Sequence, residues 1–150
     1  MTGPNPTTDR GKMGTKRHVL TDQRGIPLSV VITSANTHDM KAATDTLDNV
    51  IVKRPSYKQN LCLDKGYDSS EIEREVIKRK YITHIRHRGE EKGLIKTRHS
   101  ARRWVVVERT NSWHNRFRKL LVRYEKKSEN YLALVCLACY IIVYRRIVLG

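Results

Sequence analysis

The chain of 150 residues is expected to form one α/β domain in which helices cover a mixed sheet. Apolar segments rich in β-branched residues, such as 28–34, precede amphipathic segments such as 71–80, whose expected buried stripe is Ile72, Val76 and Ile77. The predicted order is strand, strand, helix, strand, helix, strand, helix, helix. Because helices bracket the apolar strand at 60–64, this strand is expected to pair in parallel with a neighbour.

Short local signals define the expected elements. Residues 1–15 are rich in Gly, Pro and Thr and are expected to be flexible, which places the folded domain at 16–150. Gly25 ends a turn that can join two strands. Asp39 and the run 68–70 stand where helix N-caps are expected. The expected strands are 16–21, 28–34, 60–64 and 81–86, and the expected helices are about 40–52, 71–80, 104–126 and 129–148.

The charge of the chain indicates a polyanionic partner. Thirty Lys and Arg residues against fifteen Asp and Glu residues give a net charge of +15. Residues 96–127 hold eleven Lys or Arg residues against Glu108 and Glu125. Charge concentrated on one segment favours a binding face over a uniformly solvated surface, and the simplest polyanion is DNA or RNA.

The cysteines and the apolar C-terminal segment favour a cytoplasmic protein without a membrane span. Cys62, Cys136 and Cys139 are few and odd in number, as expected in a reducing compartment. The C-x-x-C pair lacks a second ligand pair for zinc, so these cysteines are expected to be buried and structural. Residues 131–144 carry no charge but are too few to cross a bilayer, which favours a buried core helix.

Asp64 ends the apolar strand at 60–64, where functional groups of α/β sheets gather. Alternation along the strand puts Leu61 and Leu63 on one face and Cys62 and Asp64 on the other. The carboxylate could bind a metal ion, cap the following helix or pair with Lys65. These alternatives stay open at this point.

Glu108 is the second acid in an apolar and basic setting, within R-R-W-V-V-V-E-R-T. On a helix its neighbours on the same face are Asn111, Ser112, Asn115 and Arg116. An ion pair or hydrogen bond with Arg109 or Ser112 would explain it, and a role as oxygen ligand for Mg²⁺ or Mn²⁺ is the alternative. Alone, the residue favours the surface interaction. The opposite, core face is expected to hold Val106, Trp113, Phe117, Leu120, Leu121 and Tyr124.

Several ordered motifs together resemble a known family. They are K-R-H-V-L-T-D-x-x-G-I-P-L, T-S-A-N-T-H-D, D-K-G-Y-D-S, W-V-V-V-E-R-T-N-S-W-H-N-R-F-R-K-L and V-R-Y-E-K-K. In this order they resemble the carboxyl-terminal half of bacterial insertion-sequence transposases of the Asp-Asp-Glu class, in the branch called insertion-sequence family Five. The resemblance runs from about Thr2 to Val148 and implies a ribonuclease H-like core.

The resemblance assigns roles to individual residues. Asp64 matches the second catalytic aspartate and Glu108 the catalytic glutamate, which together would hold two Mg²⁺ (or Mn²⁺) ions. His38 and Asp39 match a further block and would either shape the site or cap a helix. The residues expected along the DNA path are Arg102, Arg103, Arg109, Arg116, Arg118, Lys119 and Arg123.

Two departures from the family pattern have consequences. The first catalytic aspartate is expected on a strand upstream of Met1, and Asp9, Asp22, Asp39, Asp45 and Asp48 do not stand where it would be. The fold is therefore expected to be an incomplete ribonuclease H-like mixed sheet with flanking helices and its first strand missing. Weak metal affinity and no cleavage by this chain alone follow. The extra valine before Glu108 would either rotate Trp104 by about 100° relative to Glu108 or make the helix begin later.

Three functions are consistent with these residues. The chain is either a transposase half that is active only with its upstream half, a non-catalytic DNA-binding remnant, or an unrelated basic protein of ribosomal type. The last offers no reason for the D-K-G-Y-D and W-V-V-V-E-R-T blocks. The resemblance further implies double-stranded DNA (transposon ends and target) as partner, a homodimer, and association with the bacterial nucleoid.

Overall fold

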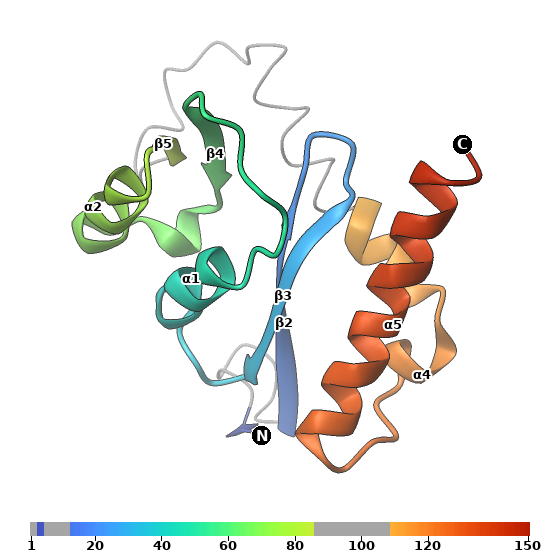
Figure 1. Ribbon diagram of the computed structural model, residues 1–150. Helices are drawn as coiled ribbons and strands as arrows, with labels where there is room; N and C mark the ends of the chain where they lie inside the picture. Colours follow the sequence, from blue (N-terminus) through green and yellow to red (C-terminus); the bar gives the residue numbers. More distant parts are fainter. Residues whose placement is uncertain (1–2, 5–12, 86–108) are drawn as a thin grey trace, which may run out of the picture.

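The computed structural model describes residues 3–4, 13–85 and 109–150, and it has the mixed α/β fold expected from the sequence (Figure 1). The described strands form two small sheets, one antiparallel in the order β1-β2-β3 and one a parallel β4-β5 pair. The strands are β1 Gly3–Pro4, β2 Met13–Thr21, β3 Pro27–Ser34, β4 Gln59–Leu63 and β5 Tyr81–Ile85. The helices are α1 Asp39–Asp48, the 3₁₀ turn η2 Lys65–Tyr67, α2 Ser70–Lys78, α4 Arg118–Leu121 and α5 Ser128–Ile147.

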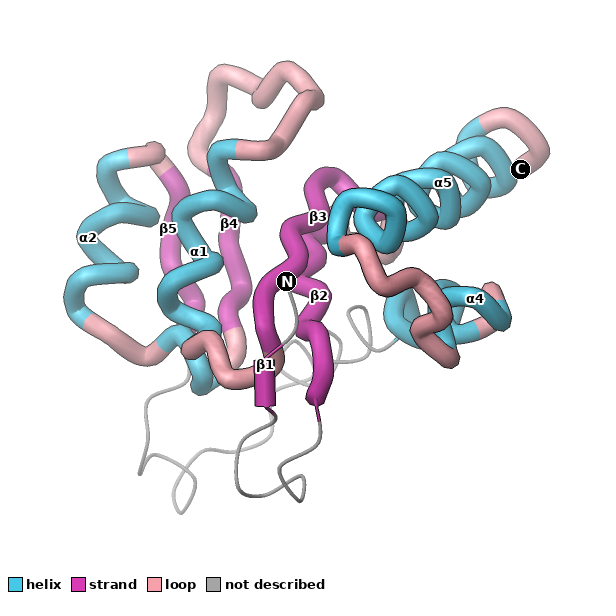
Figure 2. The backbone as a smooth tube through the Cα atoms, turned by 90° about the horizontal axis from the view of Figure 1, so that it is seen from below, coloured by secondary structure: helices cyan, strands magenta, loops and turns pink. Residues whose placement is uncertain are grey.

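The β2–β3 hairpin stands between two groups of elements. Helices α1 and α2 with the β4–β5 pair lie on one side of it, and α4 with α5 lies on the other (Figures 1 and 2). Because strand side chains alternate between faces, the hairpin contributes to two cores. Leu20 packs with a cluster of Ala43, Leu61, Ile72 and Val76. Val30 and Ile32 pack with a cluster of Leu120, Tyr131, Val135 and Ala138.

The hairpin turn follows its sequence signal. The Asp22 carboxylate accepts hydrogen bonds from the backbone N–H groups of Arg24 and Ile26, both at 2.8 Å. Gly25 has φ of 84°, a left-handed conformation that glycine adopts without a Cβ penalty. Strand β2 begins at Met13, earlier than the expected residue 16, and two residues of the N-terminal segment pair with it as β1.

The parallel pairing expected for the strand near residue 60 is confirmed, with β5 as its partner. Leu61 is buried and Cys62 exposed, so the predicted alternation is correct. Ser69 caps α2 by accepting a hydrogen bond from the N–H of Glu71. The prediction that Ile77 belongs to the buried stripe is wrong, because α2 turns only Ile72 and Val76 inward and leaves Ile77 57% exposed.

Helix α1 begins one residue earlier than expected. His38 is its N-cap, and its Nδ1 accepts a hydrogen bond from the N–H of Met40 at 3.4 Å. The prediction that Asp39 is the N-cap is therefore wrong. Asp39 occupies the first helical position, where its charge suits the positive end of the helix dipole. Its carboxylate is available for contacts outside the helix.

The single helix expected at 104–126 is not continuous in its described part. Residues 109–115 are helical, Phe117 is extended with ψ of 105°, and α4 contains only four residues. The carbonyls of Glu125 and Lys126 accept hydrogen bonds from the Arg123 guanidinium rather than from helical N–H groups. These contacts favour the extended connection to α5 over a continuing helix. Leu121 and Tyr124, expected in the core, are 61% and 72% exposed.

Helix α5 matches the expected range of 129–148 closely, but it is not a buried core helix. It buries one stripe of Tyr131, Val135, Ala138 and Ile142. The C-x-x-C pair is correspondingly less buried than expected, because Cys136 is exposed and Cys139 is half-buried. By length and composition α5 could cross a membrane, although only 22% of its most apolar window is buried in this fold.

Candidate metal and nucleic-acid site

Asp64 lies directly after β4, at the carboxyl end of that strand and before the η2 turn. Its side chain is exposed, and its backbone carbonyl accepts a 2.9 Å hydrogen bond from the N–H of Tyr67. The parallel strand β5 fixes β4 in place, and the buried Leu61 anchors it in the core. The sheet thus presents a carboxylate at the edge where ligand sites of α/β sheets form.

Asp39 reaches the same turn from α1. Its Oδ2 lies 3.0 Å from the point where a Cβ on Gly66 would be, so the carboxylate packs against the backbone of the turn. Its Oδ1 accepts a 2.9 Å hydrogen bond from Nζ of Lys16, which also donates to the carbonyl of Thr37 at 3.0 Å. The ion pair ties strand β2, the start of α1 and the turn after Asp64 together.

Tyr67 makes a second connection from this turn to β2. Its hydroxyl lies 3.3 Å from Nδ1 of His18, and Nε2 of His18 lies 2.8 Å from Oγ1 of Thr33. Burial lowers the pKa of His18, the charge on Lys16 lowers it further, and Asp39 acts in the opposite direction. His18 is therefore a neutral, buried hydrogen-bonding residue at neutral pH.

The pKa of Tyr67 is raised by burial and by two carboxylates that lie near it. Burial, then the charges of Asp39 and Asp64, raise the pKa of the Tyr67 phenol to about 12. Because both carboxylates act on one hydroxyl, the H-D block that contains Asp39 and the D-K-G-Y block that contains Asp64 meet in space. The resemblance placed both blocks near the site, and the fold brings them together.

The helical residues 109–115 are attached to the opposite side of the hairpin. Thr110 is fully buried, and its Oγ1 donates a 2.7 Å hydrogen bond to the carbonyl of Gly25 in the turn. Farther along, Nη2 of Arg17 in β2 donates to Oδ1 of Asn115 at 3.0 Å. The helix that follows Glu108 is therefore fixed to the hairpin at two points.

His114 belongs to the same helical stretch, 109–115, and is fully buried. Burial and the positive charge of Arg17 lower its pKa to about 4, so the ring is neutral. Its Nε2 lies 3.3 Å from Sγ of Cys139, whose thiol pKa is raised to about 11 mainly by burial. Neither group has the charge or exposure that a catalytic residue needs.

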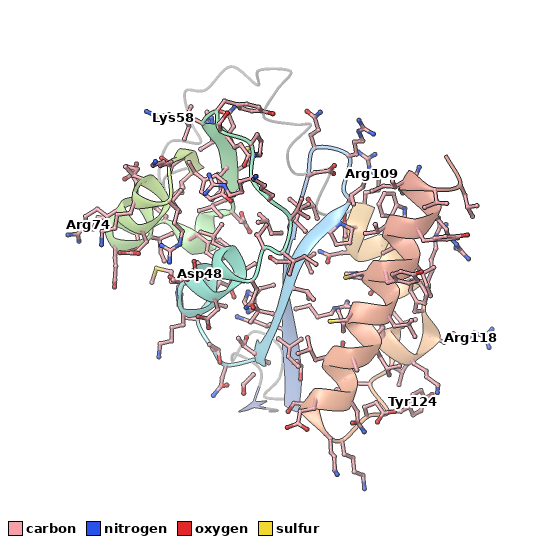
Figure 3. All side chains as sticks on the ribbon, in the orientation of Figure 1. Asp48, Lys58, Arg74, Arg109, Arg118 and Tyr124 are labelled. Atoms are coloured by element: carbon pink, nitrogen blue, oxygen red, sulfur yellow. The ribbon has the colours of Figure 1, made fainter. Side chains whose placement is uncertain are left out.

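Glu108, Arg102 and Arg103 lie outside the residues that the structure describes. The expected DNA-path residues that are described come from the stretch 109–115 and its continuation into α4, on the side of the hairpin that holds α5. Figure 3 shows Arg109 and Arg118 on this side. Exposed members of the set are Arg109, Arg116, Arg118 and Lys119.

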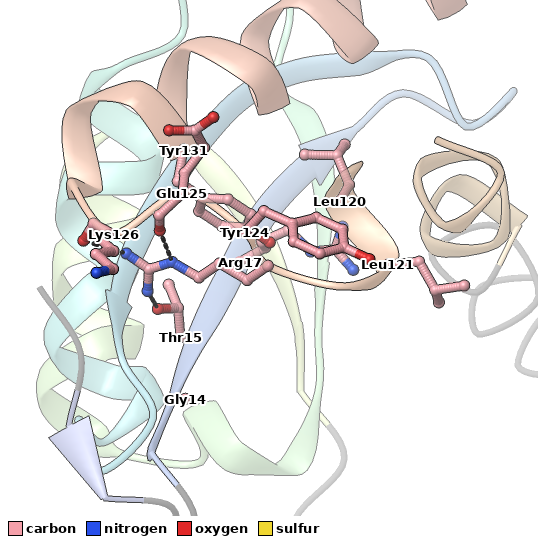
Figure 4. A pocket seen from close by; sticks show the side chains of 10 residues that line it. Gly14, Thr15, Arg17, Leu120, Leu121, Tyr124, Glu125, Lys126 and Tyr131 are labelled. Carbon is pink, nitrogen blue, oxygen red and sulfur yellow. Dashed lines mark hydrogen bonds between the residues drawn. The ribbon is translucent and has the colours of Figure 1, made fainter. Parts of the chain in front are cut away.

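Arg123 differs from these exposed cations because its guanidinium is engaged within the fold. It donates to Oγ1 of Thr15, to the carbonyl of Glu125 at 2.9 Å and to that of Lys126 at 3.4 Å. It also lies 4.9 Å above the ring of Tyr131. These contacts close one side of a cavity of about 520 Å³ between β2, α4 and the start of α5 (Figure 4). The remaining lining residues are Gly14, Arg17, Leu120, Leu121 and Tyr124.

The described residues do not form a complete metal site. In residues 3–4, 13–85 and 109–150, no group of three His, Cys, Asp or Glu side chains is placed to hold a metal ion. Asp64 offers the hard oxygen donors that Mg²⁺ prefers, whereas one oxygen of Asp39 is paired with Lys16. No catalytic step through a metal ion follows from these residues alone.

Sequence reasoning did not assign roles to the side chains that position Asp64 and the helix after Glu108. Lys16, Arg17 and His18 are consecutive residues of β2, and each contacts a different block. The K-R-H letters were part of the resemblance, but their partners lie 23, 98 and 49 residues away. Alternation along a strand predicts that Lys16 and His18 share a face, so this part of the arrangement can be predicted from the sequence.

Comparison with known proteins gives two matches. Residues 2–142 match the family described as Transposase DDE domain. The chain is 35% identical over 147 residues to the Burkholderia cepacia protein named "Putative transposase for insertion sequence element IS402", a match that covers 94% of this chain and 67% of that protein. No solved structure matches.

Proposed function

Because the chain belongs to the DDE transposase family, we propose that it is the part of an insertion-sequence transposase that binds DNA and supplies two acids for metal-dependent phosphodiester cleavage and strand transfer. The observation that supports this most is the exposed Asp64 at the end of β4, in a turn held by Asp39 and Tyr67. A carboxylate fixed at a sheet edge in a strongly basic chain suits chemistry on a phosphate backbone.

In this proposal Asp64 and Glu108 are ligands of two Mg²⁺ or Mn²⁺ ions in the complete protein. Such ions, when bound, lower the pKa of a water or hydroxyl and stabilise the charge that develops at phosphorus. The role of this chain is to orient the carboxylates. The turn after β4 orients Asp64, and the contacts of Thr110 and Asn115 with the hairpin orient the helix that follows Glu108.

Asp39 is a positioning residue in the same proposal. Its carboxylate packs against Gly66 and is held by Lys16, so it sets how the turn after Asp64 lies on the hairpin. His38 contributes by capping α1, the helix whose first residue is Asp39. The charge of Asp39 is compensated by Lys16, which distinguishes its role from that of Asp64.

The same proposal assigns the two sheets to one ribonuclease H-like sheet. The described strands include an antiparallel β2–β3 hairpin and a separate parallel β4–β5 pair. A strand supplied by a further part of the transposase would join β2 to β4. The curated relative is longer than the matched region, which covers 67% of it.

DNA binding can be measured on the chain as it is. A labelled DNA duplex of about 30 base pairs, titrated with the protein at several salt concentrations, should show a steep linear fall of log affinity with log salt. Arg118→Ala with Lys119→Ala should weaken binding and reduce the slope by about 2, since each lost phosphate contact removes about one unit. Lys78→Ala is the matched control, because Lys78 is exposed on α2, on the other side of the hairpin.

Catalysis is tested by adding what the chain is proposed to need. The chain alone is expected not to convert a supercoiled DNA circle to its nicked form in the presence of Mg²⁺. Fused to, or mixed with, the additional region of the Burkholderia relative, it should cleave, and Asp64→Asn or Glu108→Gln should abolish cleavage while DNA binding persists. Cleavage that survives Asp64→Asn would reject the assignment.

A DNA-binding remnant without catalysis is the alternative. It is favoured by the lack of a three-ligand group among the described residues. In that case the chain still binds DNA with the same salt dependence, but the added region restores no cleavage. Asp64→Asn then leaves the affinity for Mg²⁺ unchanged. Isothermal titration with Mg²⁺ of the fused protein and of its Asp64→Asn variant separates the two functions.

A further inference from the structure

Helix α5 has two apolar faces, and only one of them is covered by the described fold. The covered stripe of Tyr131, Val135, Ala138 and Ile142 packs toward the hairpin and α4. The opposite side exposes large apolar residues to solvent. These are Leu137, Tyr140, Tyr144 and Ile147, which are 54%, 64%, 42% and 65% exposed.

The exposed residues follow the spacing of a helix-pairing seam. Leu137, Tyr140, Tyr144 and Ile147 are separated by three, four and three residues, the a/d pattern of a coiled coil. Ala133 continues the pattern toward the N-terminus and is exposed. The rings of Tyr140 and Tyr144 are stacked with centroids 6.3 Å apart, so these two residues of the stripe lie side by side. Such a stripe fits another helix with the same spacing.

The charge distribution allows a second copy to approach this stripe. A chain with a net charge of +15 repels itself over most of its surface. Residues 131–144 carry no Lys, Arg, Asp or Glu, so two α5 helices can meet along them without placing like charges in contact. A symmetric pair also requires a surface that complements itself, which an uncharged apolar stripe does.

The exposed stripe supplies about half of the area of a standard interface. At roughly 200 Å² for a large apolar side chain, the exposed fractions of the four stripe residues leave about 450 Å² per copy. A standard interface buries about 800 Å² on each partner. An exposed apolar patch as large as this stripe on a monomer often marks an interaction site.

We propose that the exposed stripe of α5 pairs with the same stripe of a second copy of this chain, with the two helices antiparallel. A parallel pair would bring Arg145 and Arg146 next to their counterparts. The antiparallel pair places them near opposite ends of a helix that is about 30 Å long, far beyond the screening length. The proposal rests on α5 and does not depend on the chemistry assigned to Asp64.

The spacing fixes the residue layers of the antiparallel pair. Leu137 packs against Tyr140 of the second copy, and the small Ala133 packs against Tyr144 of the second copy. Cys136 and Val143 flank the stripe and face each other across the two-fold axis. This pairing is specific to the antiparallel arrangement, because in a parallel pair Cys136 lies beside Ile141 instead.

Analytical ultracentrifugation of the whole chain from about 1 to about 100 µM, in about 0.3 M salt and without DNA, tests the pair. The expected result is a dimer that Leu137→Glu weakens by roughly 100-fold or more, as expected when a charge replaces a central apolar contact. Ile51→Glu is the matched control, because Ile51 is 92% exposed in a loop outside α5. Circular dichroism should be unchanged in both variants, since each substitution is at an exposed position.

Cross-linking tests the direction of the helices. Val143→Cys, with Cys62 and Cys139 replaced by Ser, should form a disulfide-linked dimer with Cys136 under mild oxidation, and replacing Cys136 by Ser as well should prevent it. A chain that stays monomeric at the highest concentration, or a dimer unaffected by Leu137→Glu, would overturn the proposal. The proposal would also be overturned if a monomeric chain sedimented with phosphatidylcholine vesicles and Leu137→Glu prevented this sedimentation. The stripe would then bind a lipid surface.

Discussion

Replacing Gly66 by Ala tests the contact that holds the turn after Asp64. The new Cβ would lie 3.0 Å from Oδ2 of Asp39, closer than carbon and oxygen normally approach. The Asp39 carboxylate cannot simply turn away, because Lys16 holds its other oxygen at 2.9 Å. Either the turn or the ion pair must shift.

The expected cost follows from this geometry. Inserting one methyl group into an occupied space costs roughly 1–3 kcal/mol, and the partly exposed Asp39 can yield by a few tenths of an ångström, so about 1–2 kcal/mol is expected for Gly66→Ala. In an Asp39→Ala background the space is open. There, Gly66→Ala should stabilise the protein by about 0.5 kcal/mol, because alanine restricts the unfolded chain. The coupling between the two positions is therefore about 2 kcal/mol.

The assay is urea unfolding of the four proteins of this cycle at pH 7, followed by circular dichroism. Asp39→Asn supplies a further background, in which the side chain keeps its volume and loses its charge. If the contact is steric, Gly66→Ala remains costly in the Asp39→Asn background and becomes favourable only in the Asp39→Ala background. An equal cost of Gly66→Ala in all three backgrounds would refute the argument.

Three further predictions concern the two cores. Thr110→Val should cost about 1–2 kcal/mol of unfolding free energy in urea, because the buried carbonyl of Gly25 loses its donor, while Thr110→Ser should cost less. His114 has a folded pKa of about 4 and an unfolded pKa near 6.5, so stability should be highest above pH 6.5 and fall as pH decreases toward 4, by at most about 3 kcal/mol. His114→Gln should flatten that part of the pH profile, and a profile identical to wild type would contradict the assignment. Val76→Ala should cost about 2 kcal/mol in the same urea assay, whereas Ile77→Ala should cost less than about 0.5 kcal/mol.

Elements with strong local signals were predicted well. The expected turn forms with Gly25 in the left-handed conformation, and Asp22 at its start accepts backbone hydrogen bonds. The Ser69 cap and the range of α5 followed from equally local patterns. In these cases the interactions that define the element connect residues within a few positions of one another, so the sequence pattern contains them.

Elements that depend on distant partners were predicted less well. No glycine or proline marks the end of the helical stretch at 115. The later connection to α5 is held by Arg123, which bonds to Thr15, more than a hundred residues earlier. The exposure of Ile77 likewise depends on which face of α2 meets Leu61 and Ala43. Helical periodicity identifies an apolar stripe but does not determine its width against a particular core.

In the candidate site, too, features set by local patterns were predicted and contacts between distant residues were not. The apolar strand pattern predicted that Asp64 lies at the strand end, on the face opposite to Leu61, and the structure places it, exposed, directly after β4. The neighbours that hold it could not be predicted, because Lys16 and His18 meet the turn only after β2 and α1 have packed together. The role of Glu108 stays a prediction from the family resemblance.

The order of side chains along β2 has a consequence for insertions and deletions. Lys16 and His18 project toward Asp39 and Tyr67, while Arg17 projects toward Asn115 on the other side of the hairpin. Deleting one residue between His18 and the turn, with the turn and the pairing of β2 with β3 kept, would exchange these faces and break all three contacts together. Removing two residues would restore the alternation. In a library of length variants, tolerated changes in this strand should therefore occur in even steps.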